Sequence, residues 1–177
     1  ANRVWIVNVG DLKPMEVPIE FFLRMAWNPA RWPAESTDDF MHQWAAREFG
    51  AAYADETASL VATYLKYNGW RKPELLSPDT FSVLNYREAE RIRQAWRDLA
   101  TRAETLHAAL PAAAKDAFYQ LVLHPVKACA IVNDLYVTAA FNSLYSTQQR
   151  ASTNTLKTQA ETLFQADADL VTYWNTT

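Results

Sequence analysis

The polar side chains near the start of the chain are of types that could do chemistry: Asn8, Asp11, Lys13 and Glu16. Carboxylates can exchange protons or activate water, an amide can bind a hydroxyl group, and an ammonium group can bind an anion. Gly10 lies among them and permits backbone angles that other residues avoid. The alternative is that the carboxylates accept hydrogen bonds from turn or helix N-terminal amides and that Lys13 is a solvated charge.

A second polar group lies further along the chain and consists of Asn68, Arg71 and Lys72. The guanidinium group of Arg71 could hold a carboxylate with two parallel hydrogen bonds. The alternative is equally good: cations at this place would complement the dipole of a helix that ends nearby.

Histidine and cysteine form no metal-binding motif. The histidines His42, His107 and His124 are too far apart for metal-ligand spacing, and Cys129 is the only cysteine. We therefore expect no metal and no cofactor. Most aromatic residues follow helical stripes, so we expect them to pack in the core.

The first polar group directly follows an apolar segment, Val4 to Val9, with the sequence VWIVNV. Such a segment is typical of a strand covered on both faces in a parallel sheet, and functional groups lie where such strands end. A buried strand must pair its N–H and C=O groups, and nothing later in the sequence resembles a partner strand. We therefore expect the chain to begin inside a larger α/β unit.

The positions of proline and glycine, which mark where helices begin and end, predict three shorter helices after this segment. The first runs from Pro18 to the Asn28–Pro29 pair, the second from Ser36 to Gly50, and the third from there to Asn68–Gly69. Residues 70–86 contain prolines and no long periodicity, so we expect an ordered connection.

The rest of the chain carries longer apolar stripes. One runs from Asn85 to Leu110 with alternating spacings of four and three residues, and a second continues that spacing after Pro111 as far as Ala139. Pro125 lies inside the second stripe and predicts a kink. A last helix is expected over residues 153–173. Three long helices with short links predict an antiparallel bundle.

Composition supports a mainly helical protein. Only 3 of the 177 residues are glycine, where average usage of roughly 7% would give about 12. This scarcity excludes the Gly-rich phosphate loops and disfavours β-sandwiches and barrels. The net charge of −3 gives no basic surface for nucleic acid. No apolar run approaches the roughly 18 residues of a membrane span, so we expect neither nucleic acid nor a membrane as partner.

Three stretches of the sequence resemble glycoside hydrolase family 115, the xylan α-1,2-glucuronidases: residues 4–29 (VWIVNVGDLKPMEVPIEFFLRMAWNP), 71–76 (RKPELL) and 117–128 (AFYQLVLHPVKA). Because full members are several times longer, the resemblance implies an internal portion. It implies that residues 1–50 are the C-terminal end of a catalytic (β/α)8 barrel. Residues 51–177 would be the helical-bundle domain that adjoins the barrel and helps some members to dimerise. The upstream carboxylates proposed for catalysis have no counterpart in this sequence.

The resemblance implies release of glucuronic or 4-O-methylglucuronic acid from xylan side chains with inversion. Such a reaction needs one carboxylic acid to protonate the leaving oxygen and one carboxylate to activate water. By resemblance, Asn8 would bind substrate, and Glu16 or Asp11 would orient substrate or water at the C-terminal face of the barrel. The remaining candidates would meet the negatively charged uronate: Lys13, Asn68, Arg71 and Lys72.

The partners that the resemblance implies are glucuronoxylan or its oligosaccharides, the missing barrel portion of the same protein, and a second copy in a homodimer. It also implies a secreted or periplasmic enzyme. We expect the isolated chain to be inactive without the barrel. The alternative hypothesis is a non-catalytic helical module for packing or dimerisation.

Overall fold

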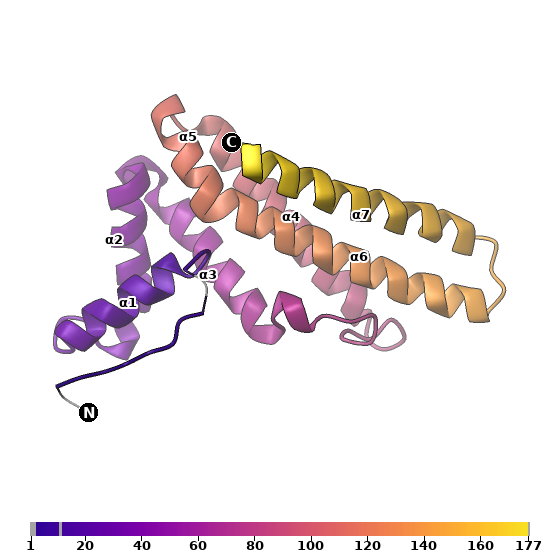
Figure 1. The fold of residues 1–177 in the computed structure, drawn as a ribbon, viewed down its shortest axis with the longest axis horizontal. Coiled ribbons are helices and arrows are strands. Elements are labelled where there is room, and N and C mark those ends of the chain that lie inside the picture. Colours follow the sequence, from indigo (N-terminus) through magenta and orange to yellow (C-terminus); the bar gives the residue numbers. More distant parts are fainter. Residues whose placement is uncertain (1–2, 11, 177) are drawn as a thin grey trace.

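The computed structural model describes residues 3–10 and 12–176. Long helices dominate this part of the chain: α4 (Glu88–Ala109), α6 (His124–Thr147) and α7 (Thr153–Thr176). The helix α6 packs against both α4 and α7, so it forms the centre of this layer (Figure 1). The prediction of a mainly helical fold with a bundle is confirmed. None of the described helices is long and apolar enough to cross a membrane.

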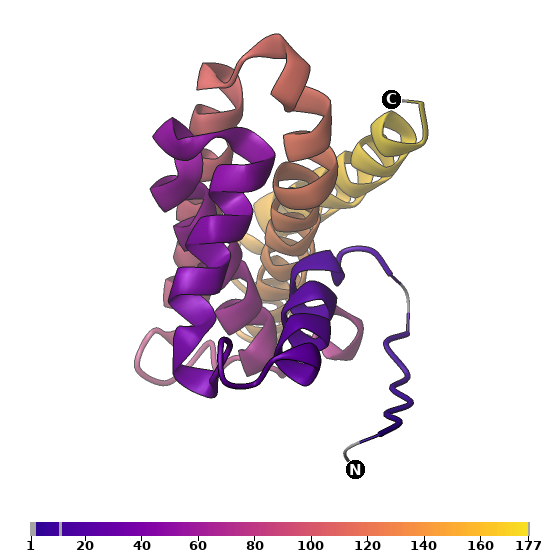
Figure 2. The same cartoon turned by 90° about the vertical axis from the view of Figure 1, so that its left-hand side faces the viewer.

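The shorter helices α1 (Glu16–Trp27) and α2 (Thr37–Phe49) lie at one end of the long helices (Figures 1 and 2), whereas α3 (Ala54–Trp70) packs along α4. Gly50 ends α2 with a φ of +93°, a value that favours glycine. Gly69, by contrast, has no such angle, and α3 continues past it to Trp70. The helix thus ends one residue after the predicted Asn68–Gly69 stop, and glycine is not what ends it.

The kink expected around Pro125 takes the form of a π-helical turn. The helix α5 (Ala112–Phe118) leads directly into this π turn (Tyr119–Leu123), after which α6 begins. Pro125 follows directly after the π turn, so its missing N–H falls where the α-helical hydrogen-bond pattern is already interrupted. The interruption lies where the kink was expected.

The core lies where α2, α3 and α4 meet the π turn. Trp96 of α4 and Phe118 of α5 are among the largest side chains that are almost fully buried. Phe118 meets the ring of Phe49 edge-on, with 5.3 Å between the ring centroids, and thereby joins α2 to the second half of the chain.

The strand expected at residues 4–9 is not confirmed. No strand occurs in residues 3–10 or 12–176, and Figure 2 shows the N-terminal segment running beside the helices. Within this chain the segment is not covered: Val4 is 72% and Ile6 94% exposed. A strand exists only with a neighbour that pairs its N–H and C=O groups, and no described segment supplies such a neighbour.

Candidate functional site

The polar group at the start of the chain forms a tight turn around Gly10. The Oδ1 atom of Asn8 accepts a hydrogen bond from the backbone N–H of Gly10 at 2.9 Å, and Gly10 has a φ of +67°. The Asn8 side chain thus stabilises the turn that glycine makes possible. Asn8 remains exposed, while Asp11 lies outside the described residues.

Lys13 turns back from this loop onto the helices. Its Nζ donates a hydrogen bond to Oε1 of Gln120 in the π turn at 3.3 Å. The same ammonium group lies 5.3 Å from the ring centroid of Trp174 near the end of α7, close enough for a cation–π attraction. Residues late in the chain therefore hold a side chain of the first polar group.

Trp174 is itself fixed by an aromatic cluster. Its ring lies 4.1 Å from that of His124, measured between centroids. The hydroxyl of Tyr119 lies 3.4 Å from Nδ1 of His124. Burial lowers the pKa of His124, so this ring is neutral at pH 7 and packs as an apolar group. Lys13 therefore lies over a packed aromatic cluster formed by Trp174, His124 and Tyr119.

Glu16 begins α1 and faces the interior between α3 and α6. Its Oε1 atom is buried and has no hydrogen-bond partner among the described residues. It lines a small cavity with Tyr64 and Val126. Burial raises the pKa of Tyr64, and the charges of Cys129 and Glu16 add to that shift. A carboxylate in such surroundings is costly unless a further donor reaches it.

Asn68 belongs to the same interior group as Glu16. Its Oδ1 accepts a hydrogen bond from the thiol of Cys129, with 3.7 Å between sulfur and oxygen. Tyr64 also interacts with Asn68 and with Cys129. The structure therefore brings two predicted site residues, Glu16 and Asn68, close to one tyrosine, Tyr64.

Arg71 and Lys72 are exposed and contact their own loop. The Nε of Arg71 donates to the carbonyl oxygen of Leu75 at 2.9 Å. The Nζ of Lys72 lies 4.0 Å from Oε1 of Glu74. These contacts stabilise the short helical turn at Pro73–Leu75 and leave the binding of a uronate by either residue a prediction.

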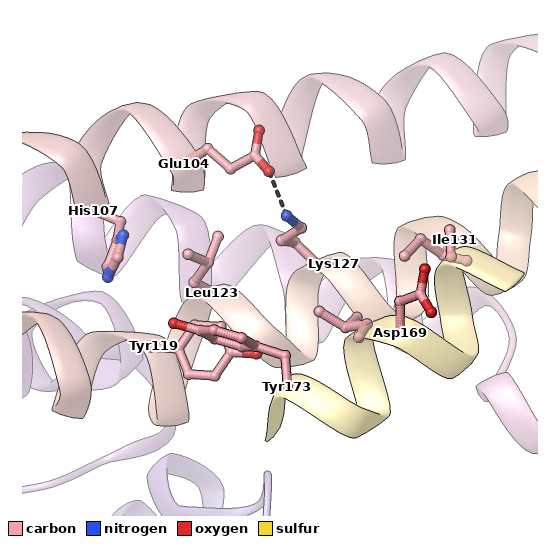
Figure 3. Close-up of a pocket in the computed structure, with 10 residues that line it drawn as sticks. Glu104, His107, Tyr119, Leu123, Lys127, Ile131, Asp169 and Tyr173 are labelled. Atoms are coloured by element: carbon pink, nitrogen blue, oxygen red, sulfur yellow. Dashed lines mark ion pairs between the residues drawn. The ribbon is translucent and has the colours of Figure 1, made fainter. Parts of the chain in front are cut away.

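Sequence reasoning missed a groove of about 570 Å³ between α4, α6 and α7 (Figure 3). An ion pair crosses it between Glu104 Oε1 and Lys127 Nζ at 2.6 Å. The rings of Tyr119 and Tyr173 meet edge-on, 5.1 Å apart. The structure adds a π turn at one wall of the groove, and such turns are frequent at functional sites. Among the described residues, no three His, Cys, Asp or Glu side chains are grouped as a metal site would require.

Residues 1–75 match the family described as Glycosyl hydrolase family 115. A solved structure titled "A novel family GH115 4-O-Methyl-alpha-glucuronidase, BtGH115A, with specificity for decorated arabinogalactans" has a TM-score of 0.76 and 26% sequence identity. The resemblance to glycoside hydrolase family 115 is confirmed. No curated protein matches the chain.

The two comparisons with family 115 cover different extents. The family match includes every predicted site residue but ends before α4. The structural match covers 97% of this chain and 23% of BtGH115A. The chain thus spans less than a quarter of that protein's length.

Proposed function

We propose that this chain is part of a glycoside hydrolase that removes glucuronic or 4-O-methylglucuronic acid from polysaccharide side chains with inversion. The observation that carries the proposal is the family 115 match over residues 1–75, which contain the turn at Gly10 and Lys13. The structural similarity to a 4-O-methyl-α-glucuronidase over 97% of the chain supports it. An extracellular or periplasmic location fits a substrate of this size.

The proposed polymer is glucuronoxylan, with decorated arabinogalactan as the second candidate. Sequence resemblance favours xylan, whereas BtGH115A is described as specific for decorated arabinogalactans. Both carry an acidic sugar as a branch, so the same uronate contacts serve either polymer. The enzyme's preference for one polymer over the other then depends on its contacts with the main-chain sugars and not on those with the branch.

In this proposal residues 1–50 belong to the catalytic unit and residues 51–177 to the supporting helices. Asn8 presents its amide to substrate hydroxyl groups, and Lys13 neutralises the uronate. Glu16 and Asp11 orient substrate or water. The carboxylic acid and the carboxylate base of an inverting hydrolase come from the barrel portion that the family resemblance implies.

The test uses the whole enzyme that carries this chain. We expect Asn8→Ala and Glu16→Gln to reduce uronic acid release by about 100-fold, in the range of lost positioning groups, with the fold retained by circular dichroism. Asn154→Ala, which changes an exposed asparagine of α7, is the matched control and should keep full turnover.

Each variant is assayed on glucuronoxylan and on decorated arabinogalactan, with the 177-residue chain alone as a further sample. Wild-type turnover by both site variants would overturn the site. Uronic acid release by the chain alone would contradict the view that the barrel supplies the acid and the base. A non-catalytic packing module predicts no effect of either substitution.

A further inference from the structure

The groove between α4, α6 and α7 has the size and lining of a small-molecule site. Its volume of about 570 Å³ lies inside the range of roughly 300 to 1,000 Å³ that is common for ligand pockets. Figure 3 shows that its side chains come from all three helices and the π turn. The lining is mixed: Glu104, His107, Tyr119, Lys127, Asp169 and Tyr173, with aliphatic side chains between them.

One wall of the groove is aromatic. Tyr173 on α7 is 54% exposed although it contacts Tyr119. Tyr119 is only 6% exposed, and its hydroxyl lies 3.4 Å from Nδ1 of His124. The buried ring therefore fixes the orientation of the exposed one. An exposed aromatic face with a polar tip suits a sugar, whose C–H groups pack on the ring while its hydroxyls bind water or protein.

The charges of the groove select against an acidic ligand. Lys127 is neutralised by Glu104 at 2.6 Å. Asp169 adds a second carboxylate, whose Oδ1 accepts a hydrogen bond from Gln165 at 2.8 Å. The groove thus has more carboxylates than ammonium groups, so it repels a uronate and offers acceptors to neutral hydroxyl groups.

The groove is joined to the first polar group by consecutive residues of α7. Tyr173 lines the groove, and its neighbour Trp174 lies under Lys13. Tyr119 contacts both rings, with centroid distances of 5.1 Å and 6.2 Å. A polysaccharide whose acidic branch meets Lys13 would therefore have neutral main-chain sugars beside this groove.

We infer that the groove between α4, α6 and α7 is a subsite for the neutral main-chain sugars of the polysaccharide. The inference rests on the proposed function, because it assigns the branch to the Lys13 side. The occupant is a segment of neutral oligosaccharide, held by the ring of Tyr173 and by hydroxyl hydrogen bonds to Asp169.

The test measures binding without turnover. Undecorated xylotetraose and a neutral galacto-oligosaccharide of equal length are titrated into the chain and followed by saturation-transfer NMR and calorimetry. We expect one of them to bind. We expect Tyr173→Ala to weaken that binding by about tenfold, as removal of a central aromatic contact does, and Asp169→Asn to weaken it less.

Phe164→Ala is the matched control, because Phe164 is an exposed aromatic residue on the same helix outside the groove. It should leave the binding constant unchanged, and circular dichroism checks that each variant remains folded. The inference is overturned if neither oligosaccharide binds, if Tyr173→Ala and Phe164→Ala behave alike, or if free glucuronate binds more tightly than the neutral sugars.

The proposed function is separated from this inference by the Asn8→Ala enzyme. If Asn8→Ala abolishes uronic acid release and Tyr173→Ala leaves binding intact, the groove assignment fails while the function stands. If neutral sugars bind in the groove but the wild-type enzyme releases no uronic acid, the function fails instead, and the assignment of the branch to the Lys13 side fails with it.

Discussion

Cys129 shows how burial changes the chemistry of a single residue. Burial raises its pKa to about 11, and the contacts with Tyr64 and Asn68 only partly oppose this shift. A thiol with such a pKa is almost fully protonated at neutral pH, and the thiolate is the form that reacts. Cys129 is therefore a buried, unreactive thiol. The amino-acid sequence alone does not distinguish it from a reactive one.

We predict that native Cys129 reacts with iodoacetamide at pH 8 more than tenfold more slowly than in the urea-unfolded chain. The reason is that the thiolate is about 100 times scarcer at a pKa near 11 than at the ordinary thiol pKa of 9.0. Mass spectrometry of timed samples measures the rate. Equal rates in the native and unfolded states would show that the thiol is accessible and unshifted.

The residue types of the candidate site were predictable from sequence, but their neighbours were not. Asn68 meets Cys129, a residue 61 positions away, and Lys13 meets Gln120, 107 positions away. No local pattern encodes such contacts, because they depend on how the helices pack. Sequence reasoning therefore placed Asn68 toward a ligand, whereas the structure directs it to a buried thiol.

At the scale of helices, α1 is docked on α2 by an ion pair with two parallel hydrogen bonds. Glu20 accepts from Nη1 and Nη2 of Arg47, each at 2.7 Å. Arg47 lowers the pKa of Glu20, and Arg24 adds to the effect. This geometry is the bidentate form that makes arginine and carboxylate pairs strong.

We predict that Arg47→Ala lowers the free energy of unfolding by about 1 kcal/mol at pH 7, the upper end for a partly exposed pair. Because the folded pKa of Glu20 is lowered, its contribution is present above the unfolded pKa of about 4.5 and is lost as the pH falls below it. Urea unfolding at pH 7 and pH 3 should therefore show a smaller difference between variant and wild type at pH 3.

Arg31→Ala is the control for this pair. Arg31 and Asp39 are both about half exposed and lie 3.4 Å apart, so its removal should cost less than Arg47→Ala. Equal losses of stability at both pH values would mean that Arg47 acts only by packing.

Helix patterns were predictable because their information is local. Apolar spacing, proline and glycine located the long helices and the break before α6. The strand predicted at residues 4–9 is not confirmed, because a strand also needs a partner and a local pattern carries no information about that partner. The groove was missed for a related reason: its lining joins three separate segments of the chain.

Across the whole molecule, Lys13 connects the N-terminal loop to the last turns of α7. The ammonium group of Lys13 lies between Gln120 and the ring of Trp174, so α7 and the π turn both hold the loop that follows Gly10. The C-terminal helix thus supports the first polar group as well as forming part of the bundle.

We predict that Trp174→Ala raises the rate of amide hydrogen exchange at Leu12, Lys13 and Met15 by severalfold. Loss of the indole ring removes a cation–π contact of about 0.5 to 1 kcal/mol, which lowers the cost of local opening. Exchange in α4 should remain as in the wild type. Trp70→Ala, which removes a partly exposed ring stacked on Tyr67, is the control and should leave exchange at these residues unchanged.

The π turn also has a consequence for the phase of the long helix. A π turn uses about one residue more than an α-helical turn, so α5 and α6 are out of step by about 100°. Deleting one residue within 119–123 would restore a continuous helix with nearly the same composition. The deletion would also rotate the preceding segment about its axis and move Tyr119 away from the groove. A related sequence that lacks one residue at the π turn would therefore be expected to lack the groove.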